Sequence, residues 1–195
     1  MGSQGRPTGM FRGSARGEVL AVIETDRLFL RRQIAADDAA VLHELWTERD
    51  PRVPPHRRIG PDGRPVLEDI AAQIDADSDD PGREFLTIVR KQEGDVIGYC
   101  GLLFVGRGSA HEPEIAYELL GRAHGAGYAT EAAGALVAWA QERGFGRLWA
   151  GVREWNLASR RVLQKLGFVE TGQVEPDAAY GDSLVVVRTF PGSTV

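Results

Sequence analysis

The sequence predicts a single α/β domain, with a mixed central sheet of about six to seven strands flanked by about four helices. Three observations predict this fold class. Short segments with alternating apolar residues are interspersed with longer segments whose apolar residues recur every three or four positions. Glycine-containing turns separate the two kinds of segment. The chain has 195 residues, 43% of them hydrophobic, which suits a globular domain with one core.

The expected elements follow one another in the order β-α-α-β-β-β-α-β-α-β-β, and no internal repeat is evident. The expected strands are 25–33, 85–90, 96–105, 115–120, 148–152, 168–174 and 184–190. The expected helices are 36–46, 66–74, 129–143 and 156–166.

The first strand and the first helix are indicated by local patterns. Leu28 and Leu30 fall on one face of the strand, because side chains alternate between the two faces of a sheet. Asp37 and Asp38 precede the apolar positions of the helix, and acidic residues favour a helix start.

The second helix follows a proline-rich loop, 51–65, and has apolar residues four positions apart between Val66 and Ile74. We expect the acidic stretch 75–81 to be a solvated turn. The next two strands form a hairpin, because Glu93–Gly94–Asp95 is a good turn sequence.

The two later helices are each followed by a glycine, Gly144 and Gly167. Glycine commonly ends a helix because it adopts the left-handed conformation without steric cost. Each of these helices leads into a further predicted strand, which completes the alternating pattern.

Composition excludes several classes of protein. The net charge of -5 disfavours general nucleic-acid binding, and no apolar run approaches the roughly 20 residues that span a membrane. The single cysteine, Cys100, rules out an intrachain disulfide.

We expect residues 1–20, rich in glycine, arginine and serine, to be a flexible tail and residues 21–195 to be the domain. No secretory signal is visible, so we expect a cytoplasmic protein.

The most informative stretch, 114–131, is a predicted strand that runs through a glycine-rich turn into a helix. Exposed amides at a helix start attract anions, and Gly125 and Gly127 let a phosphate approach the backbone. The P-loop pattern fails because its Gly-Lys pair is missing. The dinucleotide-binding fingerprint is weak because Thr130 stands at its third small position and several strands precede the turn. The pattern Arg/Gln-x-x-Gly-x-Gly/Ala fits, beginning at Arg122.

On these residues the chain resembles the GCN5-related N-acetyltransferase (GNAT) superfamily, and within it the group of the ribosomal-protein N-terminal acetyltransferases RimJ and RimL. The resemblance covers about residues 24–190. It is carried by three blocks in the expected order. These are the opening strand at 24–31, the turn and helix start at 122–131, and the late helix and strand at 156–168.

The resemblance implies an acetyl-CoA site. The strand at 115–120 should splay from that at 148–152, so that the pantetheine arm enters between them. A backbone N–H at this strand would polarise the thioester carbonyl, and the loop amides would hold the pyrophosphate. The implied cofactor-binding residues are Leu119, Leu120, Arg122, His124, Gly125, Ala126, Gly127, Tyr128, Ala129, Thr130, Asn156 and Ser159.

The catalytic side chains follow less directly. Glu114 and Glu118 are four apart in a strand and so share a face, where either can draw a proton from the amine through water. In many relatives a Tyr acts as the acid that protonates the leaving thiolate, and this chain has Leu163 at that position. Some relatives also have a Glu where this chain has Gly151. Ser159 is therefore the preferred proton donor or thiolate-binding group.

The expected function is acetyl transfer from acetyl-CoA to a primary amine, by direct attack in a ternary complex. The acceptor is a protein N-terminus or a small-molecule amine, and the enzyme is a monomer or a homodimer. No metal is expected, since His111 with two neighbouring glutamates offers too few ligands. A non-catalytic acyl-CoA-binding or sensor domain is the main alternative, and nucleotide binding is a third.

Overall fold

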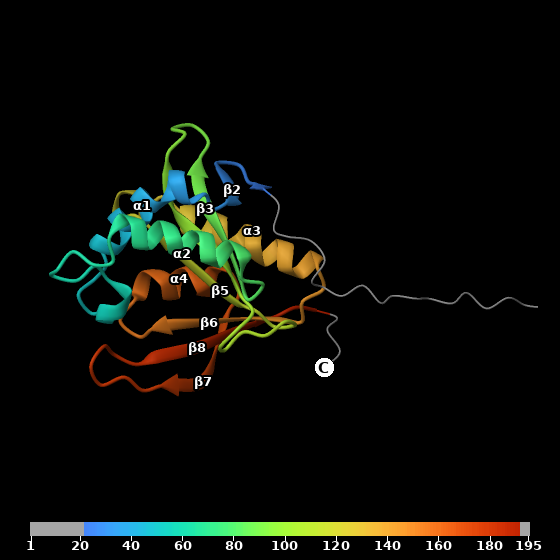
Figure 1. The fold of residues 1–195 in the computed structure, drawn as a ribbon. Helices are drawn as coiled ribbons and strands as arrows, with labels where there is room; N and C mark the ends of the chain where they lie inside the picture. Colours follow the sequence, from blue (N-terminus) through green and yellow to red (C-terminus); the bar gives the residue numbers. More distant parts are fainter. Residues whose placement is uncertain (1–21, 192–195) are drawn as a thin grey trace, which may run out of the picture.

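The computed structural model describes residues 22–191, so the tail expected at 1–20 lies outside the described residues. The described chain forms one mixed sheet of eight strands with helices on both faces (Figure 1). The strands are β1 (Ile23–Glu24), β2 (Leu28–Arg32), β3 (Arg83–Arg90), β4 (Val96–Leu103), β5 (Glu114–Leu119), β6 (Arg147–Arg153), β7 (Val169–Glu175) and β8 (Ser183–Thr189). The helices are α1 (Ala35–Thr47), α2 (Leu67–Asp79), α3 (Tyr128–Glu142) and α4 (Leu157–Lys165), with short 3-10 turns at η1 (Pro55–Arg57) and η2 (Gly121–Ala123).

The strands lie in the order β1-β2-β3-β4-β5-β6-β8-β7. All neighbouring pairs are antiparallel except β5 and β6, which are parallel. Parallel neighbours need a crossover connection, and α3 supplies it between these two strands. The central crossover therefore follows directly from the glycine-rich turn.

The main core lies between the sheet and α3. Leu28 and Leu30 are fully buried there, as the alternation in the first strand predicts. Leu136 of α3 is also fully buried. Each such leucine contributes about 1.5–3 kcal/mol on leaving water. A second, smaller cluster joins α1 and α2 on the other face, through Leu42 and Ile70 among others.

One buried carboxylate holds α1 against the sheet. Asp38 is 1% exposed and accepts hydrogen bonds from both terminal nitrogens of Arg31, from the Thr87 hydroxyl at 2.7 Å and from the Ile34 amide at 2.8 Å. Burial by itself would raise the pKa of Asp38, but these hydrogen bonds lower it below its ordinary value. Helix α1 is thereby fixed to β2 and β3 by a polar network.

Two expectations need correction. The sheet has eight strands rather than six to seven, because the short β1 pairs with β2 ahead of the predicted first strand. The acidic stretch 75–81 is not simply a turn, since α2 continues to Asp79. The Asp77 carboxylate accepts hydrogen bonds from Gln73, one turn earlier in α2, and from Arg83 at the start of β3. An aspartate at this position is therefore compatible with a helix.

The glycine positions agree with the predictions. Gly94, Gly144 and Gly167 all have positive φ, at the hairpin turn and after two helices. No helix within residues 22–191 is long and apolar enough to cross a membrane.

Candidate active site

The central feature is an opening in the sheet between β5 and β6. The two strands pair at a single position, Glu114 opposite Trp149. The Trp149 amide donates to the Pro113 carbonyl at 3.0 Å, and the Gly151 amide donates to the Glu114 carboxylate at 3.0 Å. Beyond this paired end the strands share no further ladder pairing. We call the unpaired stretch, Ile115–Leu119 facing Ala150–Arg153, the β5–β6 opening.

The backbone of β5 presents hydrogen-bonding groups to this opening. The Leu120 amide donates to Ile97 of β4 at 2.9 Å. Because donors alternate along an antiparallel pair, the amides of Tyr117 and Leu119 point away from β4 and toward β6. The Leu119 carbonyl lies 2.8 Å from His124 Nε2. Of the two leucines expected at the pantetheine, Leu119 therefore offers a backbone N–H to the opening, whereas the Leu120 amide is already bonded.

The glycine-rich turn forms a row of available amides at the start of α3. Gly125 and Gly127 have φ values of 76° and 84°, and the first intrahelical bond runs from the Glu131 amide to Gly127. Within the described chain, the amides from 125 to 130 have no protein acceptor. Positive φ at both glycines and the positive end of the helix dipole make this turn suited to an anion such as a pyrophosphate.

Helix α1 holds the beginning of the turn. Glu48 accepts a hydrogen bond from the Gly121 amide at 2.5 Å, and Glu44 pairs with the guanidinium of Arg122. The Arg122 side chain is therefore directed to α1 in this structure. We expect its contribution to a phosphate site to come through the backbone of the turn.

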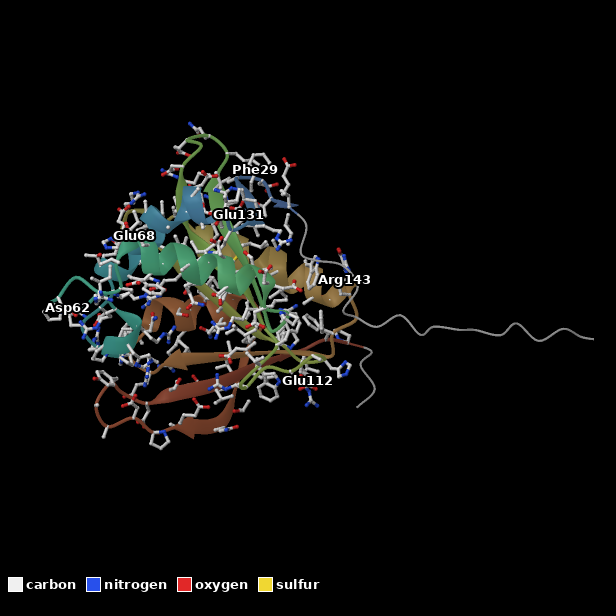
Figure 2. All side chains as sticks on the ribbon, viewed as in Figure 1. Phe29, Asp62, Glu68, Glu112, Glu131 and Arg143 are labelled. Carbon is white, nitrogen blue, oxygen red and sulfur yellow. The ribbon has the colours of Figure 1, made fainter. Side chains whose placement is uncertain are left out.

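Arg27 and Glu131 hold the other side of the turn, a contact that the sequence analysis missed. Arg27 donates to the Ala126 carbonyl at 3.0 Å and to Glu131 at 2.7 Å, and it lies 4.5 Å from the Tyr128 ring centre. Figure 2 shows Glu131 on α3 beside the amino-terminal strands. Burial opposes ionisation of Glu131, but hydrogen bonds from Thr25 and Arg27 lower its pKa. Arg27 and Glu131 lie in two of the three sequence blocks that carry the family resemblance. Their presence in these blocks is the sequence signal that could have suggested that they interact.

Ser159 lies across the opening, in the first turn of α4. Its amide donates to the Asn156 side chain at 3.1 Å, so Asn156 caps the helix. Its hydroxyl oxygen is 2.9 Å from the hydroxyl of Tyr117 on β5. Tyr117 was not among the predicted site residues, because strand alternation does not tell which helix faces the strand. Leu163, which stands where many relatives have a Tyr, is buried in the core.

Glu118 is bound by two side chains. Arg49 makes a two-pronged ion pair with it, and the Tyr99 hydroxyl donates to it at 3.0 Å. Burial would lower the pKa of Arg49, but the hydrogen bond to Glu118 raises it instead. Burial also raises the pKa of Tyr99. The carboxylate of Glu118 therefore has partners within the protein.

Glu114 lies at the other end of β5, where the strands pair. It accepts from the Gly151 amide and from Arg107 at 2.7 Å. Arg107 also pairs with Glu175 of β7. Glu114 thus helps to close the paired end of the sheet.

The loop between α1 and α2 crosses from the β5 side of the opening to the β6 side. Arg49 reaches Glu118 on β5, and Arg52 lies 4.2 Å from the ring centre of Trp155, which follows β6. Figure 2 labels Asp62 of this loop at the edge of the molecule. Residues 48–58, which we call the crossing loop, therefore contact residues on both sides of the β5–β6 opening.

No group of three or more potential metal-binding side chains gathers anywhere in residues 22–191. His111 and its neighbours do not form one, since Glu112 bonds the Trp149 indole at 3.0 Å and Glu114 bonds Arg107.

The family described as "Acetyltransferase (GNAT) domain" matches residues 27–169. A comparison with functionally curated proteins gives no match. Among solved structures, an acetyltransferase of the GNAT family from Bacillus anthracis is 22% identical, with a TM-score of 0.69, and the alignment covers 87% of this chain and 98% of that one.

Two further structures are similar. The ribosomal-protein-S5-alanine acetyltransferase of Vibrio fischeri is 18% identical, with a TM-score of 0.64 and coverage of 88% and 98%. A Salmonella typhimurium protein, described as an acetyltransferase and solved with its cofactor acetyl-CoA, is 19% identical, with a TM-score of 0.66 and coverage of 86% and 96%. These likenesses establish a shared fold.

Proposed function

This chain belongs to the GNAT acetyltransferase family and is an acyltransferase, and from that premise we propose that it moves the acetyl group of acetyl-CoA to a primary amine by direct attack. The observation that carries the proposal is the position of the glycine-rich turn, with its row of available amides, at the end of β5, the strand that borders the opening. A phosphate group and an extended arm of the same molecule can therefore be held by one continuous stretch of backbone.

The proposed binding mode uses backbone groups for the cofactor. The amides from 125 to 130 hold the pyrophosphate, and the pantetheine arm pairs with Tyr117 and Leu119 of β5. The Leu119 N–H is the candidate for polarising the thioester carbonyl. Asn156 acts by capping α4, which keeps Ser159 at the opening.

Catalysis is then mainly a matter of positioning. A neutral amine attacks the thioester carbon, and good orientation of the reactants can lower the barrier by roughly 7–11 kcal/mol. A peptide N-terminus has a reference pKa of about 7.7–8.0, against about 10.4 for lysine, so it needs little help to lose its proton. We propose that Glu118, being paired with Arg49, contributes by fixing the crossing loop.

A protein N-terminus is the first acceptor class that we propose, and a small amine is the second. The RimJ/RimL-like blocks in the sequence support the first, as does the fold shared with the Vibrio fischeri enzyme, which is named for an alanine of a ribosomal protein. A broad screen of amines and N-terminal peptides, read by release of the CoA thiol, tests the proposal. Tight acetyl-CoA binding without thiol release from any acceptor would instead favour a non-catalytic acyl-CoA sensor.

The crossing loop supports an acceptor that carries negative charge near its amine. The Arg57 carbonyl accepts a hydrogen bond from Arg49, the residue that pairs with Glu118 on β5, so Arg57 lies near the site. Arg57 is exposed, and within residues 22–191 its guanidinium has no ion pair. We propose that Arg57 attracts a carboxylate of the acceptor.

Changing Arg57 to Glu should raise the KM for acidic acceptors about 10-fold, because a favourable charge becomes a repulsive one. The KM for acetyl-CoA should stay the same, and the effect should shrink at high salt. Arg64→Glu, in the same linker but paired with Asp69 at 3.8 Å, is the matched control. Equal effects of the two variants would contradict a specific role for Arg57.

Changing Ser159 to Ala should lower turnover about 100-fold, the effect seen when one donor to developing charge is removed. The affinity for acetyl-CoA, measured by calorimetry, should change much less. An equal loss in turnover and affinity would make Ser159 a binding residue only.

A further inference from the structure

Tyr117 is the side chain that connects the two sides of the β5–β6 opening. It stands on β5, and its hydroxyl is 2.9 Å from Ser159 Oγ and 3.2 Å from the Ser159 carbonyl oxygen on α4. Burial raises the pKa of Tyr117 to about 12, although the hydrogen bond with Ser159 opposes this. The phenol therefore keeps its proton at any pH near neutrality.

Ser159 has few other partners to orient its hydroxyl. Its amide is committed to Asn156, and in the described chain its Oγ has no hydrogen-bond partner besides Tyr117. A hydroxyl donates one hydrogen bond and accepts up to two. The single proton of the phenol has two acceptors in reach, the Ser159 carbonyl oxygen at 3.2 Å and Ser159 Oγ at 2.9 Å. When the phenol donates to the nearer Oγ, the proton of Ser159 is left free to point into the opening. The hydrogen bond from the Tyr117 phenol therefore sets the direction in which the Ser159 hydroxyl can donate its own proton.

The other acid-base candidates are occupied. Glu118 is paired with Arg49, and Glu114 closes the paired end of the sheet. Leu163 gives no polar group. The Tyr117–Ser159 pair is the hydroxyl pair that the fold brings to the opening.

We propose that Tyr117 is a positioning residue that directs the Ser159 hydroxyl to the sulfur of the departing CoA. This inference rests on the proposed acetyl transfer. In that step a C–N bond forms, the C–S bond breaks and its electron pair moves to sulfur. Ser159 donates a hydrogen bond to the resulting thiolate, and Tyr117 strengthens it by donating to Ser159 Oγ. The amine loses a proton to water, and water returns one to the thiolate, so both hydroxyls keep theirs.

The test is a double-mutant cycle with Tyr117→Phe and Ser159→Ala, using an acceptor found in the screen. Phenylalanine keeps the ring and removes only the hydroxyl. We expect Tyr117→Phe to lower kcat about 10-fold and Ser159→Ala about 100-fold. Because the phenol acts only through the serine, the double variant should be no slower than Ser159→Ala alone. The Kd for acetyl-CoA should stay within about threefold throughout.

A matched control separates this role from general stability. Thr87→Val removes another buried hydroxyl with a hydrogen bond, to Asp38, on the opposite side of the sheet. It should lower the melting temperature and leave kcat unchanged. If Tyr117→Phe leaves kcat unchanged, or if the two losses multiply in the double variant, the proposal is overturned. A loss of cofactor affinity that matches the loss of kcat also overturns it.

The proposed function can fail separately. A wild-type protein that releases no CoA thiol with any acceptor overturns both ideas. A wild-type protein that turns over, combined with an unaffected Tyr117→Phe variant, overturns only the positioning role.

Discussion

Replacing Gly127 with glutamate is expected to abolish acetyl-CoA binding while the fold is kept. Gly127 has a φ of 84° at the start of α3, and a Cβ there would meet only Arg27, at 3.5 Å. A side chain therefore fits, at a cost of about 1–2 kcal/mol for the left-handed backbone. Its carboxylate would stand beside the amides proposed to hold the pyrophosphate. Two like charges 4 Å apart repel by about 1–4 kcal/mol near a protein surface, so the affinity should fall about 100-fold or more.

The measurement is calorimetric titration with CoA, together with a thermal melt. Gly144→Glu is the matched control, since Gly144 has a φ of 78° with open space around it at the other end of the same helix. That variant should lose similar stability and keep its affinity. Gly127→Gln, with the same shape and no charge, should lose less affinity than Gly127→Glu. Unchanged CoA affinity in Gly127→Glu would defeat the assignment of the turn.

Replacing Asp38 with alanine is expected to destabilise the protein by about 3–5 kcal/mol. The change removes the acceptor of Arg31, of the Thr87 hydroxyl and of the Ile34 amide, all at one buried position. Breaking a buried ion pair by removing one partner leaves the other uncompensated, which accounts for this magnitude. Urea unfolding measures it. Asp37→Ala is the control, because Asp37 is its exposed neighbour and should cost well under 1 kcal/mol.

The contribution of Asp38 also depends on pH in a definite direction. Its pKa is lowered in the folded state, so the folded protein binds the proton less readily than the unfolded chain, whose Asp pKa is about 3.9. The stabilisation is present above that value and is lost as the pH falls through the lower folded pKa. The difference in stability between the wild type and Asp38→Ala should therefore be constant near neutrality and shrink in acid. A difference that is independent of pH down to pH 2 would count against the ion pair.

Much of the fold could be predicted from the sequence because the signals are local. Alternation placed Leu28 and Leu30 in the core, and Gly144 and Gly167 marked the ends of two helices. The end of α2 was misplaced, because a run of aspartates is typical of a turn when its neighbours are not known. The two-residue β1 was missed because only its pairing with β2, and no local pattern, makes these residues a strand.

The features of the candidate site can likewise be separated into those that local sequence indicates and those that only the packed fold brings together. The glycine-rich turn and the start of α3 could be predicted from residue spacing, since one short segment of the chain forms them. The contacts of Glu118 and Ser159 were not predictable in this way. Arg49 is 69 positions from Glu118, and Tyr117 is 42 positions from Ser159. Nothing local in either segment indicates these partners.

The sequence by itself determined the order of the strands and helices other than β1, the family and the position of the glycine-rich turn, because each depends on residues that are neighbours along the chain. Only the tertiary structure decided that Asp38 is a buried anchor rather than merely a helix-start residue, and that Tyr117 faces Ser159. Both facts depend on which helix covers which face of the sheet. The physical reason is that burial and hydrogen bonding act between whatever groups the packed fold brings within a few ångströms, however far apart they lie along the chain.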